Sequence, residues 1–286
     1  MPPFYKATVL TITGAFLFTC VDVFIKLLSP GLPVGQVLIA FGAGTAVMFW
    51  LMAFLSSQPV FDIRYVHKAT LFRCVSETVG GLALVIALSH SALSTVTAIM
   101  QTSPLVLTIM AVFFLKEKIG AARIIAILIG FIGVLIIIRP SLSGFDIYAV
   151  YALVGVIGLA GRDFSARILP NYISVLGLSF FGSLAVVLAG LLLMTVSGGW
   201  VLPDAQQTVL CVGMVIAGGL GLFCMSSSIR LADVSAVSPF RYTRIVFGMI
   251  TGVLLFNETV DELTLLGSII IIGAGLYSWS HERHHP

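Results

Sequence analysis

Ten long apolar runs, separated by short connections rich in Gly, Pro, Ser and Asn, account for most of this sequence. Each run is close to the length, about 20 residues, that an α-helix needs to cross a bilayer. Charged side chains make up only 9% of the 286 positions, against roughly 25% in a soluble domain, and the mean hydropathy is +1.12. Because so few charges cannot cover a water-facing surface, we expect lipid to surround most of the chain. The runs fall at residues 6–28, 34–55, 69–88, 93–115, 121–138, 147–168, 174–197, 206–229, 234–256 and 263–280.

Lysine and arginine are distributed unevenly between the two ends of the predicted spans. Cytoplasmic connections of membrane proteins carry an excess of these residues. With a cytoplasmic N-terminus, the cytoplasmic ends hold most of the basic residues and the outer ends hold few, so we predict a multi-pass protein of the cell inner membrane with both termini cytoplasmic. The cytoplasmic group is Lys6, Arg64, Lys68, Lys116, Lys118, Arg123, Arg167, Arg230 and Arg283, and the outer group is Lys26 and Arg139.

The chain matches itself when it is shifted by 141 positions. Acidic residues are scarce here, so coincidences among charged positions carry more weight than matches between aliphatic residues. Each half holds five predicted spans, an odd number, so the halves should insert in opposite senses, as in many secondary transporters. We therefore predict an all-α polytopic membrane protein with ten transmembrane helices as two inverted five-helix repeats, residues 1–141 and 142–286. The charged positions that coincide are Asp22 with Asp163, Lys26 with Arg167, and Glu117 with Glu258.

Two matching stretches resemble the EamA family of the drug/metabolite transporter superfamily. The first runs from Thr102-Ser103-Pro104 to Lys116-Glu117, and the second from Ser238-Pro239 to Asn257-Glu258. The resemblance covers essentially the whole chain. It implies ten helices, cytoplasmic termini, alternating access, and cargoes such as amino acids, nucleotide derivatives, vitamins or drugs. In size and organisation the chain resembles the YddG-type amino-acid exporters of that superfamily.

Ionisable and polar residues within the spans are candidates for the transport site, because a charge at bilayer depth is expensive unless it is paired or hydrated. Arginine forks suit carboxylates, and Glu77 could bind an amine, although a pair with Arg73 one turn away would neutralise both. Gln101 and Thr102 precede Pro104, which should break the fourth span and expose its backbone. The predicted substrate-binding residues are Arg241, Arg244, Glu77, Gln101, Thr102, Tyr242 and Arg162; Arg162 is expected to point to a different face from its neighbour Asp163.

Two i,i+4 combinations of opposite charge repeat between the halves, Asp22 with Lys26 and Asp163 with Arg167. In inverted halves they lie near opposite faces of the membrane, so we interpret them as ion pairs that could act as alternating gates. The alternative is that Lys26 and Arg167 extend toward the interface. Glu117 and Glu258, beside turns, are expected to serve helix termination.

The sequence therefore predicts a secondary transporter of a small polar metabolite, an amino acid or similar zwitterion, with export favoured. The alternatives are uptake of a vitamin or nucleotide-like metabolite, or a channel. We expect no enzymatic activity, because no GxSxG motif is present, and drive by ATP would require a partner protein, because no P-loop is present. We also expect no cofactor and no metal site. The predicted partners are a small-molecule substrate and membrane lipid, without nucleic acid, in a monomer or weak dimer.

Overall fold

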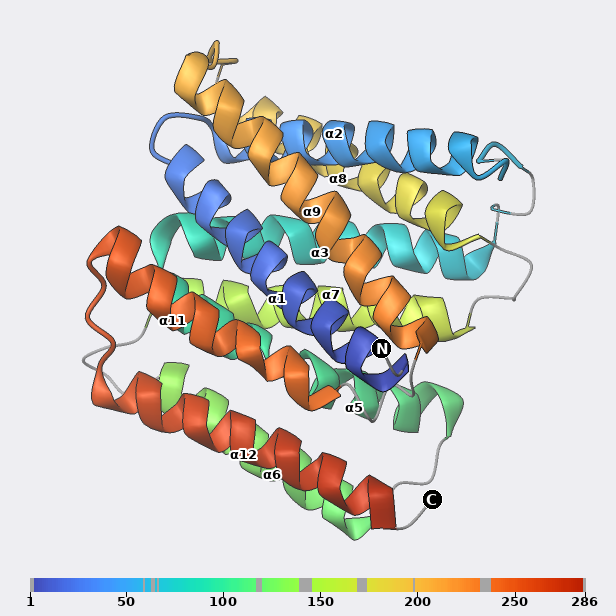
Figure 1. Cartoon of the computed structure of the whole chain (residues 1–286). Coiled ribbons are helices and arrows are strands. Elements are labelled where there is room, and N and C mark those ends of the chain that lie inside the picture. The colour runs from blue at the N-terminus through green and yellow to red at the C-terminus, as the bar shows by residue number, and fades with distance from the viewer. Residues whose placement is uncertain are drawn as a thin grey trace.

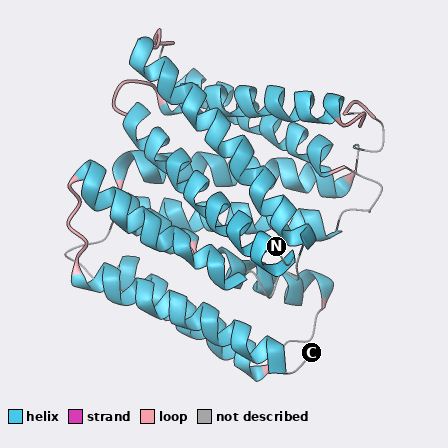
Figure 2. Ribbon diagram, viewed as in Figure 1, coloured by secondary structure: helices cyan, strands magenta, loops and turns pink. Residues whose placement is uncertain are grey.

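The computed structural model describes residues 3–58, 60–62, 65, 67–116, 120–138, 146–168, 174–197, 199–231 and 238–284. Within these ranges the regular structure is entirely helical (Figure 2). The elements are α1 (Pro3–Leu28), α2 (Val34–Leu55), α3 (Lys68–His90), α4 (Leu93–Met100), α5 (Ser103–Leu115), α6 (Ala121–Ile138), α7 (Ile147–Ile168), α8 (Val175–Ser197), α9 (Ala205–Leu231), the 3-10 helix η2 (Ser238–Tyr242), α11 (Thr243–Phe256) and α12 (Glu262–His284), labelled where there is room in Figure 1.

The outer surface of the bundle is apolar, as a lipid-facing surface must be. Large side chains such as Leu55 and Leu254 are 82% and 74% exposed, whereas in water an apolar surface of this extent would be a liability. In the part of the chain that the structure describes, seven helical segments are long and apolar enough to cross a membrane, and α6 and α12 contain shorter apolar stretches. The predicted all-α membrane protein is thus confirmed. The seven segments are Phe4–Leu28, Val34–Leu55, Lys68–His90, Leu93–Phe114, Ile147–Ser165, Leu176–Thr195 and Ala205–Met225.

Helices from opposite halves of the sequence pack in pairs (Figure 1). α1 lies along α9, α3 along α7, α2 along α8, and α6 along α12. Glycines permit the close approach that drives helix association in lipid. A Cβ added to Gly158 would meet the backbone of Gly80, and one added to Gly133 would lie 2.9 Å from the carbonyl oxygen of Gly267. Small residues therefore set the spacing of the α3–α7 and α6–α12 pairs.

The start of α1 and the end of α12 lie at the same end of the bundle (Figure 1). We call this the termini end. The end of α1 at Leu28 and the end of α11 at Phe256 lie at the opposite end, which we call the far end. The two ends give the directions in which a central site could open.

Two of the predicted continuous spans are broken near the middle of the bundle. The fourth is interrupted at Gln101 and Thr102, between α4 and α5, where the amides bond three residues back rather than four. The break predicted from Pro104 is confirmed. The ninth span changes from η2 to α11 after Tyr242, which is 141 positions after Gln101. Proline does not occupy matching positions in the two halves, yet the breaks do, so the proline is not what fixes the location of the second break.

Candidate functional site

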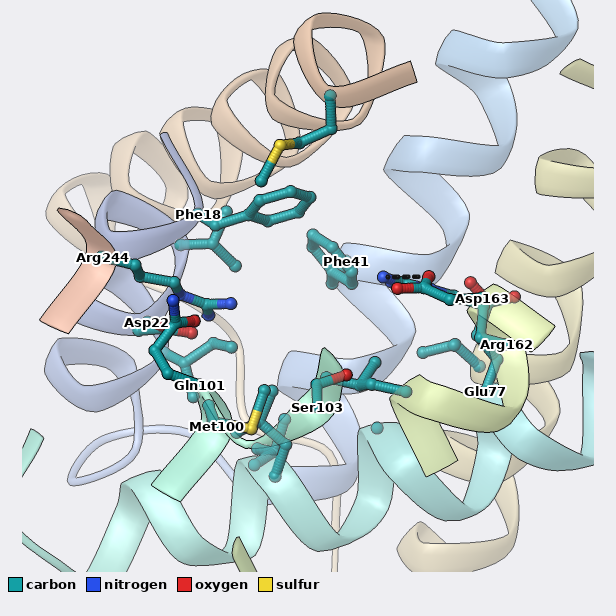
Figure 3. Close-up of a pocket in the computed structure, with 18 of the residues that line it drawn as sticks. Phe18, Asp22, Phe41, Glu77, Met100, Gln101, Ser103, Arg162, Asp163 and Arg244 are labelled. Carbon is teal, nitrogen blue, oxygen red and sulfur yellow. Dashed lines mark hydrogen bonds and ion pairs between the residues drawn. The ribbon is translucent and has the colours of Figure 1, made fainter. Parts of the chain in front are cut away.

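A cavity of about 150 Å³ lies between the two broken helices and α1, α3 and α7. Its walls are mainly apolar, but charged groups of both signs line it (Figure 3). A concave, mostly apolar site with a few convergent polar groups is the usual form of a small-molecule site. The titratable residues on its walls are Asp22, Glu77, Arg162, Asp163, Arg241 and Arg244.

The first charged group joins α1 to α11. Arg244 Nη2 lies 2.6 Å from Asp22 Oδ2, and Asp22 is only 2% exposed. The Arg244 guanidinium also lies over the ring of Phe18, 5.5 Å from its centroid, a favourable cation–π arrangement. Arg244 thus has its own counter-ion.

The second charged group centres on Asp163 of α7. Its Oδ1 lies 3.0 Å from Arg162 Nη2, and its Oδ2 lies 3.6 Å from Arg241 Nη2. The expectation that Arg162 points to a different face from Asp163 is wrong, because the long arginine side chain turns back to its neighbour. Figure 3 shows Asp22 with Arg244 on one side of the cavity and Asp163 with Arg162 on the other.

Glu77 of α3 makes the predicted i,i+4 contact with Arg73, with 3.4 Å between Oε1 and Nη2. Its second oxygen, Oε2, is buried and has no hydrogen-bond partner among the described residues. Glu77 also lines the cavity, and its Oε2 lies on the side of Gly182 of α8.

Gln101 connects the two helix breaks directly. Its side-chain Nε2 donates to the main-chain carbonyl of Arg241, 2.5 Å away, and Gln101 lines the cavity as predicted. Thr102 and Tyr242 are not among the lining residues. The Thr102 hydroxyl donates to the carbonyl of Ile99 at 2.7 Å, and Tyr242 is 5% exposed with its ring against Gly275 of α12.

Lys26 lies at the far end, and the predicted ion pair between Asp22 and Lys26 is wrong. Lys26 Nζ lies 2.7 Å from Glu258 Oε1 and donates to the Ser91 carbonyl at 2.8 Å. The side chain of Arg167, the repeat counterpart of Lys26, lies outside the described part of the structure. The gate residues predicted in the first half therefore belong to two different ion pairs.

Glu258 also holds the start of α4. Its Oε1 accepts from the Leu93 amide at 2.6 Å, and its Oε2 accepts from the Ser94 amide and hydroxyl at 3.1 and 2.9 Å. Burial would raise the pKa of Glu258, but the hydrogen bond from Lys26, those from the Leu93 and Ser94 amides, and the Lys26 charge together lower it. Helix termination was the role predicted for Glu258. In addition, its contacts join the end of α1, the start of α4 and the connection that follows α11.

Two further cavities continue from the central one. A cavity of about 60 Å³ shares Phe18, Phe41 and Glu77 with the central site, and it shares Ser179 with a third cavity of about 220 Å³. The third cavity is lined by Gln58, beside the termini end of α2. Sequence reasoning missed this series of cavities, because serines within apolar helices are common and carry no distinguishing pattern.

The cavities contain no evident metal site. Among the described residues, no group of three or more His, Cys, Asp and Glu side chains could hold a metal ion. The central cavity offers guanidinium groups that can bind an anion and carboxylates that can bind a cation. Ionic hydrogen bonds of this kind form and break reversibly.

Comparison with known proteins gives the family. The model of the EamA-like transporter family matches residues 5–139 and 146–279. The S-adenosylmethionine uptake transporter of Rickettsia bellii is 30% identical over 196 residues, which cover 68% of this chain and 67% of that protein. The pseudopaline exporter CntI of Pseudomonas aeruginosa is 26% identical over 280 residues, 94% of both chains. The riboflavin transporter of Vibrio cholerae is 28% identical over 176 residues, 61% of this chain and 58% of that protein.

A solved structure shares the fold. It superposes with a TM-score of 0.67 over 98% of both chains, at 14% sequence identity. The helical membrane architecture, the central cavity and the two family matches agree with one another. The chain belongs to the EamA-like transporter family.

Proposed function

We propose that this protein is a secondary transporter that moves a small polar metabolite, an amino acid or similar zwitterion, across the inner membrane by alternating access. The observation that carries the proposal is the central cavity, where guanidinium and carboxylate groups converge beside the breaks of two helices. Discontinuous helices at the bilayer midplane form the substrate sites of many transporters, because unwound backbone is tolerated only where it lines a cavity.

We propose further that residues 1–141 and 142–286 are inverted repeats with ten crossings. α6, α11 with η2, and α12 would add three crossings to the seven long apolar segments. Lys116 and Asn257, 141 positions apart, both end their helices at positive φ, 55° and 50°. The pairing of α1 with α9 also has its repeat counterpart in the pairing of α7 with α3. Such matched details support two copies of one unit.

The mixed charges of the cavity support a zwitterionic cargo. The guanidinium groups suit a carboxylate and Glu77 suits an ammonium group. The relatives support metabolites rather than inorganic ions, since S-adenosylmethionine, riboflavin and pseudopaline are all organic. Export is the proposed net direction, supported by the pseudopaline exporter that matches along 94% of both chains. Uptake is the alternative direction. It is supported by relatives whose names describe uptake, such as the S-adenosylmethionine uptake transporter of Rickettsia bellii.

A two-stage experiment tests the proposal. Purified protein is screened by thermal shift against amino acids, nucleotides and vitamins, because a cargo that binds the folded state stabilises it by mass action. Compounds that stabilise are then tested in proteoliposomes. We expect saturable uptake that is accelerated by unlabelled compound on the opposite side. Flux that neither saturates nor responds to compound on the opposite side would indicate a channel, and no flux for any stabilising compound would reject a transporter.

A further inference from the structure

The charges around the central cavity do not balance. Three guanidinium groups and three carboxylates line the cavity. The guanidinium of Arg73, which pairs with Glu77 and lines the adjoining cavity of about 60 Å³, adds a fourth positive charge, so this cluster of described residues carries a net charge of +1. The guanidinium groups belong to Arg73, Arg162, Arg241 and Arg244, and the carboxylates to Asp22, Glu77 and Asp163. Lys26 and Glu258 form a separate, neutral pair at the far end.

The ion pairs locate the surplus charge. Asp22 forms an ion pair with Arg244 at 2.6 Å, and Glu77 forms one with Arg73 at 3.4 Å. Asp163 alone is shared, between Arg162 at 3.0 Å and Arg241 at 3.6 Å.

Arg241 is the arginine with the weaker hold on Asp163, and its side chain is 27% exposed. Its backbone is nevertheless fixed, because the Arg241 carbonyl accepts from Gln101. Arg241 therefore shares its counter-ion, Asp163, with Arg162. It lies where η2 contacts the break between α4 and α5.

This imbalance is permanent. Guanidinium does not deprotonate in proteins, and protonation of any carboxylate in the cluster would only increase the positive charge. An uncompensated charge of this kind is destabilising away from bulk water. The cavity is therefore most stable when an anion is inside it, and a zwitterion of zero net charge would leave the surplus in place.

We propose that Arg241 binds a second acidic group on the cargo, so that the preferred substrate carries a net charge of −1: an amino-acid-like metabolite with one more carboxylate than ammonium. One cargo carboxylate bonds to Arg241, and the ammonium lies beside the carboxylate of Glu77, which lines the cavity. The loaded cluster is then electrically neutral. The inference rests on the proposed transport function and narrows its substrate class.

Pairs of nearly isosteric ligands test the charge directly. L-glutamate and L-glutamine, and L-aspartate and L-asparagine, differ within each pair by one charge and almost nothing in shape. Purified protein is titrated with each by thermal shift, and each competes in counterflow with a compound that the wild type exchanges. We expect the acidic member to bind at least about tenfold more tightly, because only its additional carboxylate makes the charge-assisted bidentate contact with Arg241.

Three variants assign the preference to one residue. Arg241→Gln makes the cluster neutral, so the acidic member should lose its advantage while the amide still binds. Arg241→Lys keeps the charge and should keep the preference at reduced affinity, because the fork is lost. Lys68→Gln removes a positive charge at the exposed start of α3 and should leave the preference unchanged.

The outcomes separate this inference from the transport function. Equal affinity for both members of each pair, a preference for the amide, or no stabilisation by any of the four would overturn the inference. So would an unchanged preference in Arg241→Gln, or equal stabilisation by chloride, which would mean that an inorganic anion balances the charge. Counterflow of neutral zwitterions would then leave the transport function standing, and only the absence of all counterflow would remove both.

Discussion

At the residue scale, two of the charged residues expected to pair along one helix find their partners elsewhere, although Glu77 does pair with Arg73 of the next turn. Asp22 lies one turn from Lys26, yet it pairs with Arg244 of α11, and Lys26 reaches Glu258 beyond the end of that helix. Spacing along a helix shows which pairs could form, but the partner with the best geometry in the packed bundle forms the pair. Removing one member of a buried pair is destabilising, because it leaves the other charge uncompensated.

Replacing Glu258 by glutamine should destabilise the far end. The glutamine side chain keeps the shape of glutamate but loses its negative charge. That charge pairs with Lys26 and accepts hydrogen bonds from the main-chain N–H groups at the start of α4. We expect about 2 kcal/mol at pH 7 and a melting temperature lower by several degrees. The matched control is Glu262→Gln at the exposed start of α12, which should change stability by less than about 0.5 kcal/mol.

The difference between wild type and Glu258→Gln should also depend on pH with a defined sign. Folding lowers the pKa of Glu258 below its ordinary value of 4.5. The stability contributed by the carboxylate is therefore fully present above pH 4.5 and is lost as the pH falls through the lowered value. Melting curves at pH 7, 5 and 3.5 measure it. A difference that already closes between pH 7 and 5 would contradict the lowered pKa.

At the element scale, close helix contacts and helix breaks determine where the cavity lies. Glycine contacts bring α3 onto α7, which places Glu77 and Asp163 on the walls of one cavity. The breaks after Met100 and Tyr242 bring Gln101 and the Arg241 backbone together. A pair of straight, widely spaced helices would leave these polar groups apart.

Gly158→Ala should therefore loosen the α3–α7 pair. The added Cβ would meet the backbone of Gly80, which cannot rotate away as a side chain can, and overpacking of this kind is destabilising by about 1–3 kcal/mol. Gly81→Ala is the matched control, since its Cβ would have its nearest neighbour 3.8 Å away and alanine favours the helix. Thermal unfolding in detergent measures both. Equal stability of the two variants would show that the contact does not limit the spacing.

At the scale of the whole molecule, the two halves of the chain interleave rather than form separate bodies. α1 of the first half packs on α9 of the second, and α2 packs on α8. Under the proposed alternating access, every helix pair of this kind would be rearranged or moved as a unit. At the far end the bonds of Glu258 join α1 and α4, and the additional cavities extend toward the termini end.

The proposed orientation predicts which end is accessible from outside the cell. In a variant whose four cysteines (Cys20, Cys74, Cys211 and Cys224) are replaced, Leu202→Cys at the far end and Lys68→Cys at the termini end report on the two sides (Figure 1). A membrane-impermeant maleimide added to intact cells should label only the cysteine at 202. The cysteine at 68 should react only after the cells are opened. The reverse pattern would invert the orientation.

The sequence predicted the helices well, because hydropathy and turn residues act locally. Helix α6 occupies residues 121–138, and α7 occupies residues 147–168, both as predicted. Within the site, Asp22, Glu77, Gln101, Arg162, Asp163, Arg241 and Arg244 were all found among the candidates and all line the cavity. They could be identified because a charge or amide within an apolar span stands out against its neighbours.

What the sequence by itself determined is the solvent of this protein, because a chain with 9% charged residues must place its apolar side chains in lipid. Each span must then form its backbone hydrogen bonds internally, as a helix does. Only the tertiary structure decided which charges meet. The pairing of Asp22 with Arg244, the contact of Asp163 with Arg241 and the attachment of Glu258 to α4 join residues far apart in the chain. Such contacts depend on distances between helices, which packing fixes and local sequence does not encode.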